Sequence, residues 1–375
     1  MSLYIDLSEF FANPIRTGIQ RISGELCRHL PSGAAVPVRL GHEGYLALSP
    51  ELIRCIGRYF DDGSQGNLSE IQRRSTPDAG RPVHPDFQDI VLVPEVFDNP
   101  DRVSFFQRKS DRELMSYRFV VYDLLPMTHP KYFATGGTIP IFAYFKLLRR
   151  APYCSFISAY TQDTYCRRLL RINERRGLVL PLGCDALGPR TAQPSYARGL
   201  DFTVLGTVEP RKNHRLILEA FLPMLNRVSG LTLTFIGKMG WVDGGFAEQV
   251  CKLSADPGSG FRWLPGLDDS AILNCIQRSR ATIYVSVAEG YGLPPVESLW
   301  VGTPVIASNC VPSLERLGNA GVHVVEPADV MNLRRAVLAF CDDSYMREKI
   351  DQAASLNLPS WRSFTEDVLA WCAAG

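Results

Sequence analysis

The sequence has little of what marks several large classes of protein. Its ten cysteines are scattered and no two form a C-x-x-C pair, so neither a zinc site nor a disulfide framework is predicted. It has no uncharged apolar run of about 18 residues, and residues 1–6 do not resemble a signal peptide. The 40 Lys and Arg residues nearly balance the 39 Asp and Glu residues, so no net field attracts nucleic acid or an anionic membrane. We therefore expect a cytoplasmic protein without a nucleic-acid partner.

Motifs that hold metal ions or nucleoside triphosphates are missing as well. There is no Asp-x-Asp motif of the kind that binds a metal–diphosphate complex, and there is no Walker loop. The six histidines have no metal-ligand spacing, and the aromatic residues lack the basic interleaving of a nucleic-acid platform. We therefore expect no metal and no other cofactor.

What the sequence does contain is typical of globular α/β proteins. Its 375 residues are 46% apolar and 21% charged, which is enough chain for two soluble domains. Short runs rich in Val, Ile, Leu, Phe and Thr alternate with stretches of helical period, and this alternation favours βαβ units with parallel sheets. The expected strands are 3–7, 90–93, 118–122, 153–157 and 178–180 in the first half, and 201–205, 231–236, 261–264, 281–285, 305–307 and 322–325 in the second.

The spacing of these strands also predicts the domain organisation. The even second series predicts a complete Rossmann-like domain over 200–360, and the first series predicts another over 1–185. Residues 186–199, rich in Gly, Pro and Ala, are interpreted as a linker, and 61–86, with few large apolar residues, as a mobile insertion. Residues 361–375 have helical spacing of apolar residues, which predicts a helix that could pack back on the N-terminal domain.

The most informative segment is 285–308, VSVAEGYGLPPVESLWVGTPVIAS. It predicts a strand, a glycine turn and a helix, with Glu289 at the end of the strand and Glu297 about one turn into the helix. Glycines let backbone N–H groups approach a ligand closely, and a helix N-terminus favours an anion such as phosphate. Glu297 can accept two vicinal hydroxyls, as a ribose presents them, and Glu289 can meet a sugar ring beyond the phosphates.

This segment resembles the donor-site signature of the GT4 family, the retaining nucleotide-sugar glycosyltransferases of glycosyltransferase group 1. The similarity lies in the E-x7-E element from Glu289 to Glu297 and in the run GTPVIAS at 302–308. The resemblance implies that Glu297 binds the ribose and that Glu289 orients the transferred sugar. It also implies a diphosphate site at Gly290, Tyr291, Gly292 and Leu293.

A second segment, 205–221, predicts a strand, a loop and a helix capped by Asn213. Arg211 and Lys212 stand in the loop, where cations would stabilise a diphosphate leaving group as it gains negative charge. In the GT4 family an Arg usually follows the glycine of this loop and a Lys lies five residues later. Lys212 keeps its position, whereas Thr207 replaces the Arg, and we expect Arg211 to supply the missing charge.

The resemblance is weaker in the first half of the chain. Gly18 precedes a helical stretch, where the family has a glycine loop near the donor phosphates or the acceptor. Asp123 keeps an acidic position at a strand end, while Tyr122 occupies the position of the usual His and cannot act as a base near neutral pH. The resemblance also implies that two strand ends of the second half, at Lys238 and Leu267, hold the nucleobase.

For the whole chain the resemblance implies a GT-B fold, in which two Rossmann-like domains with parallel sheets face each other across a cleft. It implies metal-independent, retaining transfer of a hexose from a nucleotide diphosphate sugar to a hydroxyl of a glycan or lipid-linked glycan in surface polysaccharide biosynthesis. GDP-mannose is favoured as the donor, with UDP-hexoses next. A non-catalytic subunit that binds nucleotide sugar or acts as a scaffold, and a nucleotide-sugar epimerase of the same fold, remain alternatives.

Two apolar and basic stretches, 52–59 and 142–150, could also contact the inner membrane surface.

Overall fold

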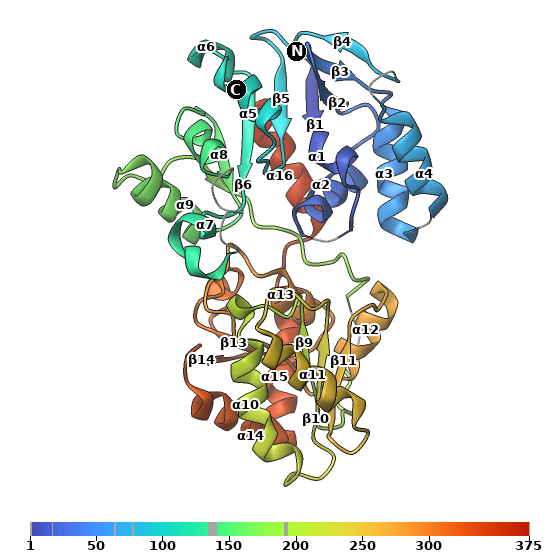
Figure 1. Cartoon of the computed structure of the whole chain (residues 1–375), viewed down its shortest axis with the longest axis vertical. Coiled ribbons are helices and arrows are strands. Elements are labelled where there is room, and N and C mark those ends of the chain that lie inside the picture. Colours follow the sequence, from blue (N-terminus) through green and yellow to red (C-terminus); the bar gives the residue numbers. More distant parts are fainter. Residues whose placement is uncertain are drawn as a thin grey trace. The chain divides into compact units, whose positions relative to one another are not determined.

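The computed structural model describes residues 2–16, 18–63, 65–76, 79–133, 141–190 and 194–374 (Figure 1). The chain forms two compact units. Unit 1 combines Met1–Gly183 with Pro359–Gly375, and unit 2 is Cys184–Leu358. Each unit is built around its own sheet.

The sheet of unit 1 has eight strands in the order β4-β3-β2-β1-β5-β6-β7-β8. Neighbouring strands are parallel, except that β3 is antiparallel to both β2 and β4. The strands are β1 (Leu3–Asp6), β2 (Val36–Gly41), β3 (Gly44–Ala47), β4 (Arg81–Val83), β5 (Ile90–Val93), β6 (Tyr117–Val121), β7 (Cys154–Phe156) and β8 (Leu178–Val179). The five strands expected in the first half correspond to β1 and β5 to β8, whereas β2, β3 and β4 were not expected.

The helices of unit 1 come mainly from its N-terminal segment, and one comes from the end of the chain. That last helix, α16 (Trp361–Ala373), packs against α2 (Gly18–His29), as the red and blue ribbons of unit 1 show in Figure 1. The other helices are α1 (Ser8–Ala12), α3 (Glu51–Asp62), α4 (Gln65–Arg74), α5 (Pro100–Gln107), α6 (Asp111–Leu114), α7 (Leu125–Thr128), α8 (Ile141–Leu148) and α9 (Ala159–Thr164), with a 3-10 turn at Pro130–Tyr132 and a π-helical turn at Tyr165–Leu170.

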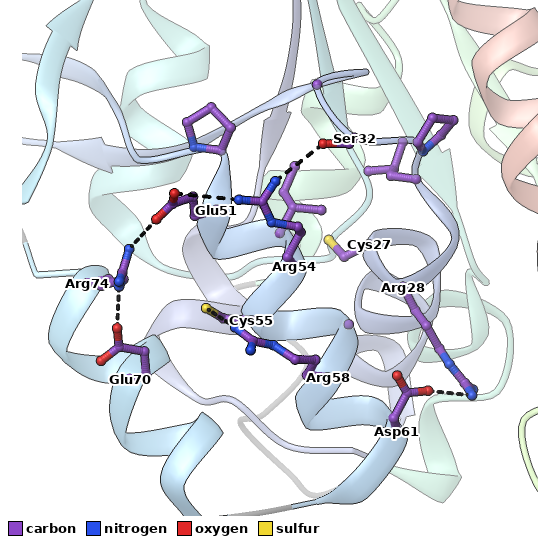
Figure 2. A pocket seen from close by; sticks show the side chains of 16 residues that line it. Cys27, Arg28, Ser32, Glu51, Arg54, Cys55, Arg58, Asp61, Glu70 and Arg74 are labelled. Atoms are coloured by element: carbon purple, nitrogen blue, oxygen red, sulfur yellow. Dashed lines mark hydrogen bonds and ion pairs between the residues drawn. The ribbon is translucent and has the colours of Figure 1, made fainter.

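The sequence suggested a mobile insertion at 61–86. The structure differs, because most of the described residues in this range form helices or a strand. Helix α4 buries only Ile71, so it has no apolar stripe that would mark it in the sequence. Its exposed side carries ion pairs: Glu70 contacts both Arg73 and Arg74, and Arg74 also reaches Glu51 of α3, as Figure 2 shows. Strand β4 then closes the edge of the sheet against β3.

A buried ion cluster fixes the carboxyl ends of the two central strands of unit 1. The Arg102 guanidinium lies 2.8 Å from a carboxylate oxygen of Asp6, at the end of β1, and 3.1 Å from one of Glu95, just after β5. Glu95 also accepts hydrogen bonds from the backbone N–H groups of Glu9 and Phe10, at 2.8 and 2.7 Å. These contacts join β1, β5 and the start of α1. Loss of Arg102 would leave the buried carboxylates of Asp6 and Glu95 without their positive partner.

Unit 2 has a six-stranded, fully parallel sheet in the order β11-β10-β9-β12-β13-β14. Its strands are β9 (Asp201–Leu205), β10 (Thr232–Ile236), β11 (Phe261–Leu264), β12 (Ala281–Tyr284), β13 (Val305–Ser308) and β14 (Val322–Val325). All six correspond to expected strands. Its helices are α10 (His214–Leu225), α11 (Gly244–Ala255), α12 (Asp269–Arg278), α13 (Leu293–Trp300), α14 (Val330–Cys341) and α15 (Asp343–Ser355), with 3-10 turns at Pro210–Lys212 and Pro312–Leu317.

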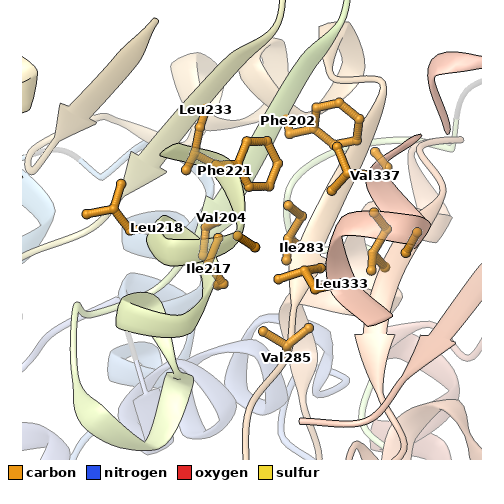
Figure 3. Close-up of a cluster of buried hydrophobic side chains, with 14 of the residues drawn as sticks. Phe202, Val204, Ile217, Leu218, Phe221, Leu233, Ile283, Val285, Leu333 and Val337 are labelled. Carbon is orange, nitrogen blue, oxygen red and sulfur yellow. The ribbon is translucent and has the colours of Figure 1, made fainter. Parts of the chain in front are cut away.

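The core of unit 2 explains why its strands were easy to find. Strand and helix side chains interlock in a large apolar cluster (Figure 3), which includes Phe202 and Val204 of β9 and Ile283 of β12. Since both faces of the inner strands are covered, these strands appear as nearly continuous apolar runs in the sequence. Helix α10 contributes Ile217, Leu218 and Phe221, and α14 contributes Leu333 and Val337.

The residues interpreted as a linker, 186–199, are part of unit 2. Arg198 Nη1 donates a hydrogen bond of 2.6 Å to the carbonyl of Ser279, and Arg190 Nη2 donates one of 2.6 Å to the carbonyl of Leu356. In the described residues 186–190 and 194–199, side chains such as these hold the segment to the unit, which explains why its sequence has no helical or strand period.

Candidate functional site

The candidate site lies at the carboxyl edge of the unit 2 sheet. The strand order places β9 beside β12, and the chain leaves these two strands toward opposite edges of the sheet. Such a switch point opens a crevice between the two following loops, and open parallel sheets bind ligands there. The loop after β9 carries Arg211 and Lys212, and the loop after β12 carries Glu289. The structure therefore brings the two sequence motifs together at one place.

The loop after β9 is fixed by its neighbour, the loop after β10. The Val208 N–H donates to the carbonyl of Lys238 at 2.9 Å, and the Gly240 N–H donates to the carbonyl of Val208 at 3.0 Å. A Cβ at Gly237 would lie only 2.3 Å from the carbonyl oxygen of Gly206, so glycine is required for this approach. The backbone beside Thr207 is therefore held in one position before any ligand arrives.

Lys212 folds back over the start of its own loop. A Cβ at Gly206 would lie 2.2 Å from Lys212 Nζ, and the ammonium lies 5.4 Å from the centre of the Tyr284 ring. Burial lowers the pKa of Lys212, while the nearby carboxylate of Glu289 acts in the opposite direction. Lys212 makes no ion pair with any residue in the described part of the chain. Its charge is thus available to an anionic ligand.

Arg211 is engaged quite differently. Its Nη2 donates to Glu209 Oε1 at 2.7 Å, and its Nη1 donates to the carbonyl of Ala288 at 2.9 Å and lies 2.5 Å from Glu289 Oε1. The Val287 N–H donates to the Arg211 carbonyl at 2.9 Å, so backbone and side chain both bridge the two loops. The guanidinium is paired with protein carboxylates, which differs from the expectation that Arg211 supplies a free charge.

The glycine turn before α13 has a conformation that only glycine adopts easily. Gly292 has φ +91°, and a Cβ there would lie 2.6 Å from Val311 Cγ1. Gly290 and Tyr291 are buried, and Leu293 begins the helix. The next two helical residues are Pro294 and Pro295, which have no N–H. Backbone donors at this helix start are therefore fewer than usual, and the N–H groups of Gly292 and Leu293 remain.

The two glutamates of the E-x7-E element lie at different depths. Glu297 is buried in the second turn of α13 and is close enough to Lys212 to influence its pKa. Glu289 is 8% exposed, and its Oε1 accepts a hydrogen bond of 2.8 Å from the Tyr284 hydroxyl. The two carboxylates are thus held by different surroundings, as a division of tasks requires.

Two residues of this site were not predicted from the sequence. Tyr284 ends β12 and is 5% exposed, so it appears in the sequence as an ordinary strand residue. His214 begins α10, and its ring lies edge-on to Phe235 at 4.8 Å without a hydrogen bond of normal geometry to either ring nitrogen. Burial and, less strongly, Lys212 lower the pKa of His214 to about 3. Because His214 directly follows Arg211, Lys212 and Asn213 in the sequence, nothing in the sequence indicated that its side chain is buried and neutral.

The residues expected to hold a nucleobase lie at the ends of two strands. Lys238 follows β10 and is exposed, and Leu267 follows β11 and is half-buried. Between them, Trp263 of β11 donates its indole N–H to the Gly237 carbonyl at 2.9 Å. This bond fixes the backbone of the loop to which Lys238 belongs.

The candidates in the first half of the chain belong to unit 1. Gly18 begins α2 with φ +62°, and there is open space where a Cβ would stand, so backbone conformation alone requires the glycine. Asp123 follows β6, and its Oδ1 accepts a hydrogen bond of 2.9 Å from the Leu125 N–H at the start of α7. Tyr122 is buried and donates its hydroxyl to the Pro94 carbonyl at 2.6 Å. The Tyr122 phenol is therefore part of the core, and Asp123 is the polar residue at the end of this strand.

The two stretches that could contact a membrane, 52–59 and 142–150, are largely packed into the core of unit 1. In the first, Leu52, Ile56 and Tyr59 are buried. In the second, Phe145, Leu147 and Leu148 are buried, and only Phe142 is partly exposed. The apolar faces that suggested membrane contact are thus used for folding. Within the described ranges, no helix is long and apolar enough to span a membrane, and no group of His, Cys, Asp or Glu side chains is arranged to hold a metal ion.

Comparison with known proteins gives concordant relatives. The serotype-specific mannosyltransferase WbdA of Escherichia coli is 26% identical over 403 residues, which cover 98% of this chain and 44% of the relative. The O-antigen chain mannosyltransferase B of Escherichia coli is 34% identical over 146 residues, which cover 38% of this chain and 37% of the relative. This chain thus spans less than half the length of the curated relatives that it matches.

The fold is similar to that of Anabaena Alr3699/HepE, solved in complex with UDP, with a TM-score of 0.66 at 12% identity over the whole of both chains. The prediction of an α/β protein of the GT-B class is therefore confirmed for the fold of its units. Residues 191–356 match the family described as glycosyl transferases group 1. This segment contains both motifs that suggested the family from the sequence. The match to this family covers most of unit 2.

Proposed function

We propose that this chain is a retaining glycosyltransferase that moves a hexose from a nucleotide diphosphate sugar to a hydroxyl of a glycan or lipid-linked glycan acceptor in polysaccharide biosynthesis. GDP-mannose is the favoured donor, because both curated relatives named above are mannosyltransferases. UDP-hexoses come next, because the similar structure of HepE contains UDP.

The observation that carries this proposal is the arrangement at the switch point of unit 2. Lys212 offers an unpaired cation and the turn at Gly292 offers backbone donors, which together suit a diphosphate. Glu289 precedes this turn in the chain, and Glu297 lies in the second turn of the helix that follows it. A diphosphate with a ribose on one side and a hexose on the other matches this order of groups.

In the proposed reaction, the bond between the anomeric carbon and the diphosphate oxygen breaks. The acceptor hydroxyl oxygen then bonds to the same face of that carbon, and the departing oxygen takes the hydroxyl proton. Lys212 stabilises the negative charge on the leaving diphosphate, which is larger in the transition state than in the bound donor. Glu289 stabilises the positive charge that spreads over the sugar ring, and Asp123 of unit 1 orients a hydroxyl of the sugar or the acceptor.

We further propose that the reaction needs no metal, because Lys212 and the backbone donors supply the positive charge that a bound cation would provide. The rate should therefore stay within about two-fold of its original value when EDTA is added. The measurement is release of nucleoside diphosphate at saturating donor, with and without EDTA and then with added Mg²⁺ or Mn²⁺. Loss of activity in EDTA that is restored by either ion would contradict this mechanism.

The main test is incubation of the protein with GDP-mannose, UDP-glucose and UDP-N-acetylglucosamine, followed by detection of free nucleoside diphosphate and of the sugar product. A transferase releases the diphosphate slowly without acceptor and faster with a glycan acceptor. Binding by calorimetry without any turnover would favour the scaffold alternative. Conversion of the donor sugar into its epimer would favour the epimerase alternative.

A further inference from the structure

We propose that Arg211 and Tyr284 are positioning residues that hold Glu289 by its Oε1 alone. Arg211 then does not belong to the diphosphate clamp, which consists of Lys212 and the backbone N–H groups of Gly292 and Leu293. The inference rests on the proposed function, since it assigns the carboxylate that faces the transferred sugar. It changes the division of tasks expected from the sequence, in which Arg211 replaced the missing Arg at Thr207.

The first step of the argument is the asymmetry of the Glu289 carboxylate. Its Oε1 lies 2.5 Å from Arg211 Nη1 and accepts the Tyr284 hydroxyl at 2.8 Å. No residue in the described part of the chain donates to Oε2. Two donors on one oxygen fix the plane of the carboxylate, and Oε2 is the oxygen left for a ligand.

The second step is that the positive charge of Arg211 is already paired with two carboxylates of the protein. Its guanidinium lies between Glu289 and the buried Glu209, and its side chain is only 14% exposed. If Arg211 turned toward a diphosphate, it would leave two carboxylates unpaired in a poorly solvated place, beside a ligand that is itself negative. Lys212 has no such partner and can meet the diphosphate without breaking an ion pair.

The third step is that Tyr284 connects the two charged groups. It is the last residue of β12, so its ring position is set by the sheet and not by a loop. Its hydroxyl contacts Glu289, while the face of its ring lies toward the Lys212 ammonium at 5.4 Å. Burial raises the pKa of Tyr284 well above its ordinary value, so the hydroxyl remains a hydrogen-bond donor at every working pH. The Tyr284 side chain thus sets the spacing between the Glu289 carboxylate, which faces the sugar, and the Lys212 ammonium, which binds the diphosphate.

The first arm of the test uses turnover of GDP-mannose, or of whichever donor proves active. Tyr284→Phe should lower kcat by about 10- to 100-fold, the effect of losing one hydrogen bond to a charged group, with little change in donor KM. Combined with Glu289→Gln, it should cause less than about a two-fold further loss, because it acts through that carboxylate. A full additional loss in the double variant would overturn the positioning role.

The second arm uses binding alone and does not depend on activity. GDP and UDP, which lack the sugar, are titrated by calorimetry into Arg211→Met, Arg211→Lys and Lys212→Ala. The affinity of the better nucleotide should fall by about ten-fold or more in Lys212→Ala and by less than about three-fold in both Arg211 variants. Equal losses in Arg211→Met and Lys212→Ala would place Arg211 in the clamp and overturn the inference.

The controls separate the inference from folding defects and from the proposed function. Arg215→Met removes an exposed guanidinium four residues further along, and it should change neither nucleotide affinity nor kcat. Thermal unfolding identifies any variant that fails to fold, and Arg211→Lys keeps a positive charge where Arg211→Met does not. If the wild-type protein binds a nucleotide but never turns over a sugar donor, the proposed function fails, and the binding arm still decides whether Arg211 is part of the clamp.

Discussion

Glu289 and Glu297 differ in their surroundings, and this difference predicts two kinds of kinetic defect. Glu297 is proposed to hold the ribose, which does not react, so Glu297→Gln should raise donor KM and leave kcat nearly unchanged. Glu289 is proposed to face the developing positive charge, so Glu289→Gln should lower kcat by about 100-fold with little change in KM. Steady-state kinetics with saturating acceptor measures both effects.

Titration with nucleoside diphosphate checks the same division without catalysis. The diphosphate carries the ribose but not the sugar, so its affinity should drop in Glu297→Gln and remain in Glu289→Gln. Equal losses in the two variants would mean that the glutamates do not divide the donor in this way.

His214 predicts how the stability of unit 2 depends on pH. Its pKa is about 3 in the folded protein, against an ordinary value near 6.5, so below pH 6.5 the unfolded chain takes up a proton that the folded chain refuses. The stability that neutral His214 contributes is therefore complete above pH 6.5 and is lost as the pH falls toward 3. Between pH 7.5 and 5.5 the loss is about 1.4 kcal/mol.

Urea unfolding at these two pH values measures the effect in the wild type and in His214→Phe. The variant cannot take up the proton, so its stability should fall by about 1.4 kcal/mol less than that of the wild type over the same interval. His84→Phe replaces an exposed histidine and should leave the pH dependence as it is. A His214→Phe protein with the pH dependence of the wild type would contradict the buried, neutral imidazole.

Single residues show what the sequence could and could not reveal about the site. The E-x7-E element and the cations of 205–221 were recognisable because their spacing is local. The pairing of Arg211 with Glu289 was not, because it joins residues 78 positions apart that meet only where β9 and β12 lie side by side. A charge in a loop does not reveal its partner until the strand order is known.

At the scale of the elements, the contact between two loops makes Gly237 a test of how the site is built. Gly237 has φ +142°, and a Cβ there would lie 2.3 Å from the backbone oxygen of Gly206, which cannot move away as a flexible side chain could. Gly237→Ala should therefore lower the free energy of unfolding by more than the roughly 1 to 3 kcal/mol that a strained backbone alone costs. It should also displace the loop that carries Lys212. Urea unfolding and nucleotide titration both measure the consequence.

Gly230→Ala is the matched control for this prediction. Gly230 also has a positive φ, of +78°, but a Cβ there would have no atom within 4 Å. Gly230→Ala therefore introduces backbone strain without a steric clash, and it should leave nucleotide affinity unchanged. If Gly237→Ala were no worse than Gly230→Ala, the close approach of the two loops would not be essential to the site.

The elements also show why unit 2 was easier to predict than unit 1. The four inner strands of unit 2, β9, β10, β12 and β13, are almost entirely buried and alternate with helices, so apolar runs mark them clearly. In unit 1, the edge strand β4 has residues that are exposed or only half-buried, and α4 buries only Ile71. Neither produces the apolar pattern on which the prediction depended. The antiparallel β2–β3 pair was missed for a related reason, since Arg39 and Gly41 interrupt its apolar run.

At the scale of the whole molecule, the chain returns to unit 1 after it has completed unit 2. Helix α16 buries Trp361, Phe364 and Val368 and packs against α2. A Cβ at Gly183, the last residue of the first segment of unit 1, would lie 2.2 Å from the backbone nitrogen of Trp361. The departure of the chain from unit 1 and its return are therefore in direct contact, and the sequence predicted the helix but not this contact.

This arrangement predicts that removal of residues 359–375 destabilises unit 1 and spares unit 2. Burial of Trp361, Phe364, Val368 and Trp371 contributes about 2 kcal/mol for each side chain, which together is comparable to the whole stability of an ordinary domain. Hydrogen exchange measured by mass spectrometry on the truncated chain should show at least a roughly ten-fold faster exchange in peptides from α2 and β1. Peptides from β9 and β12 should keep the exchange rates of the full chain. A control chain that lacks only residues 374 and 375, beyond the end of α16, should behave as the full chain does. Unchanged protection of α2 in the longer truncation would show that α16 is an appendage of unit 1 and not a part of its core.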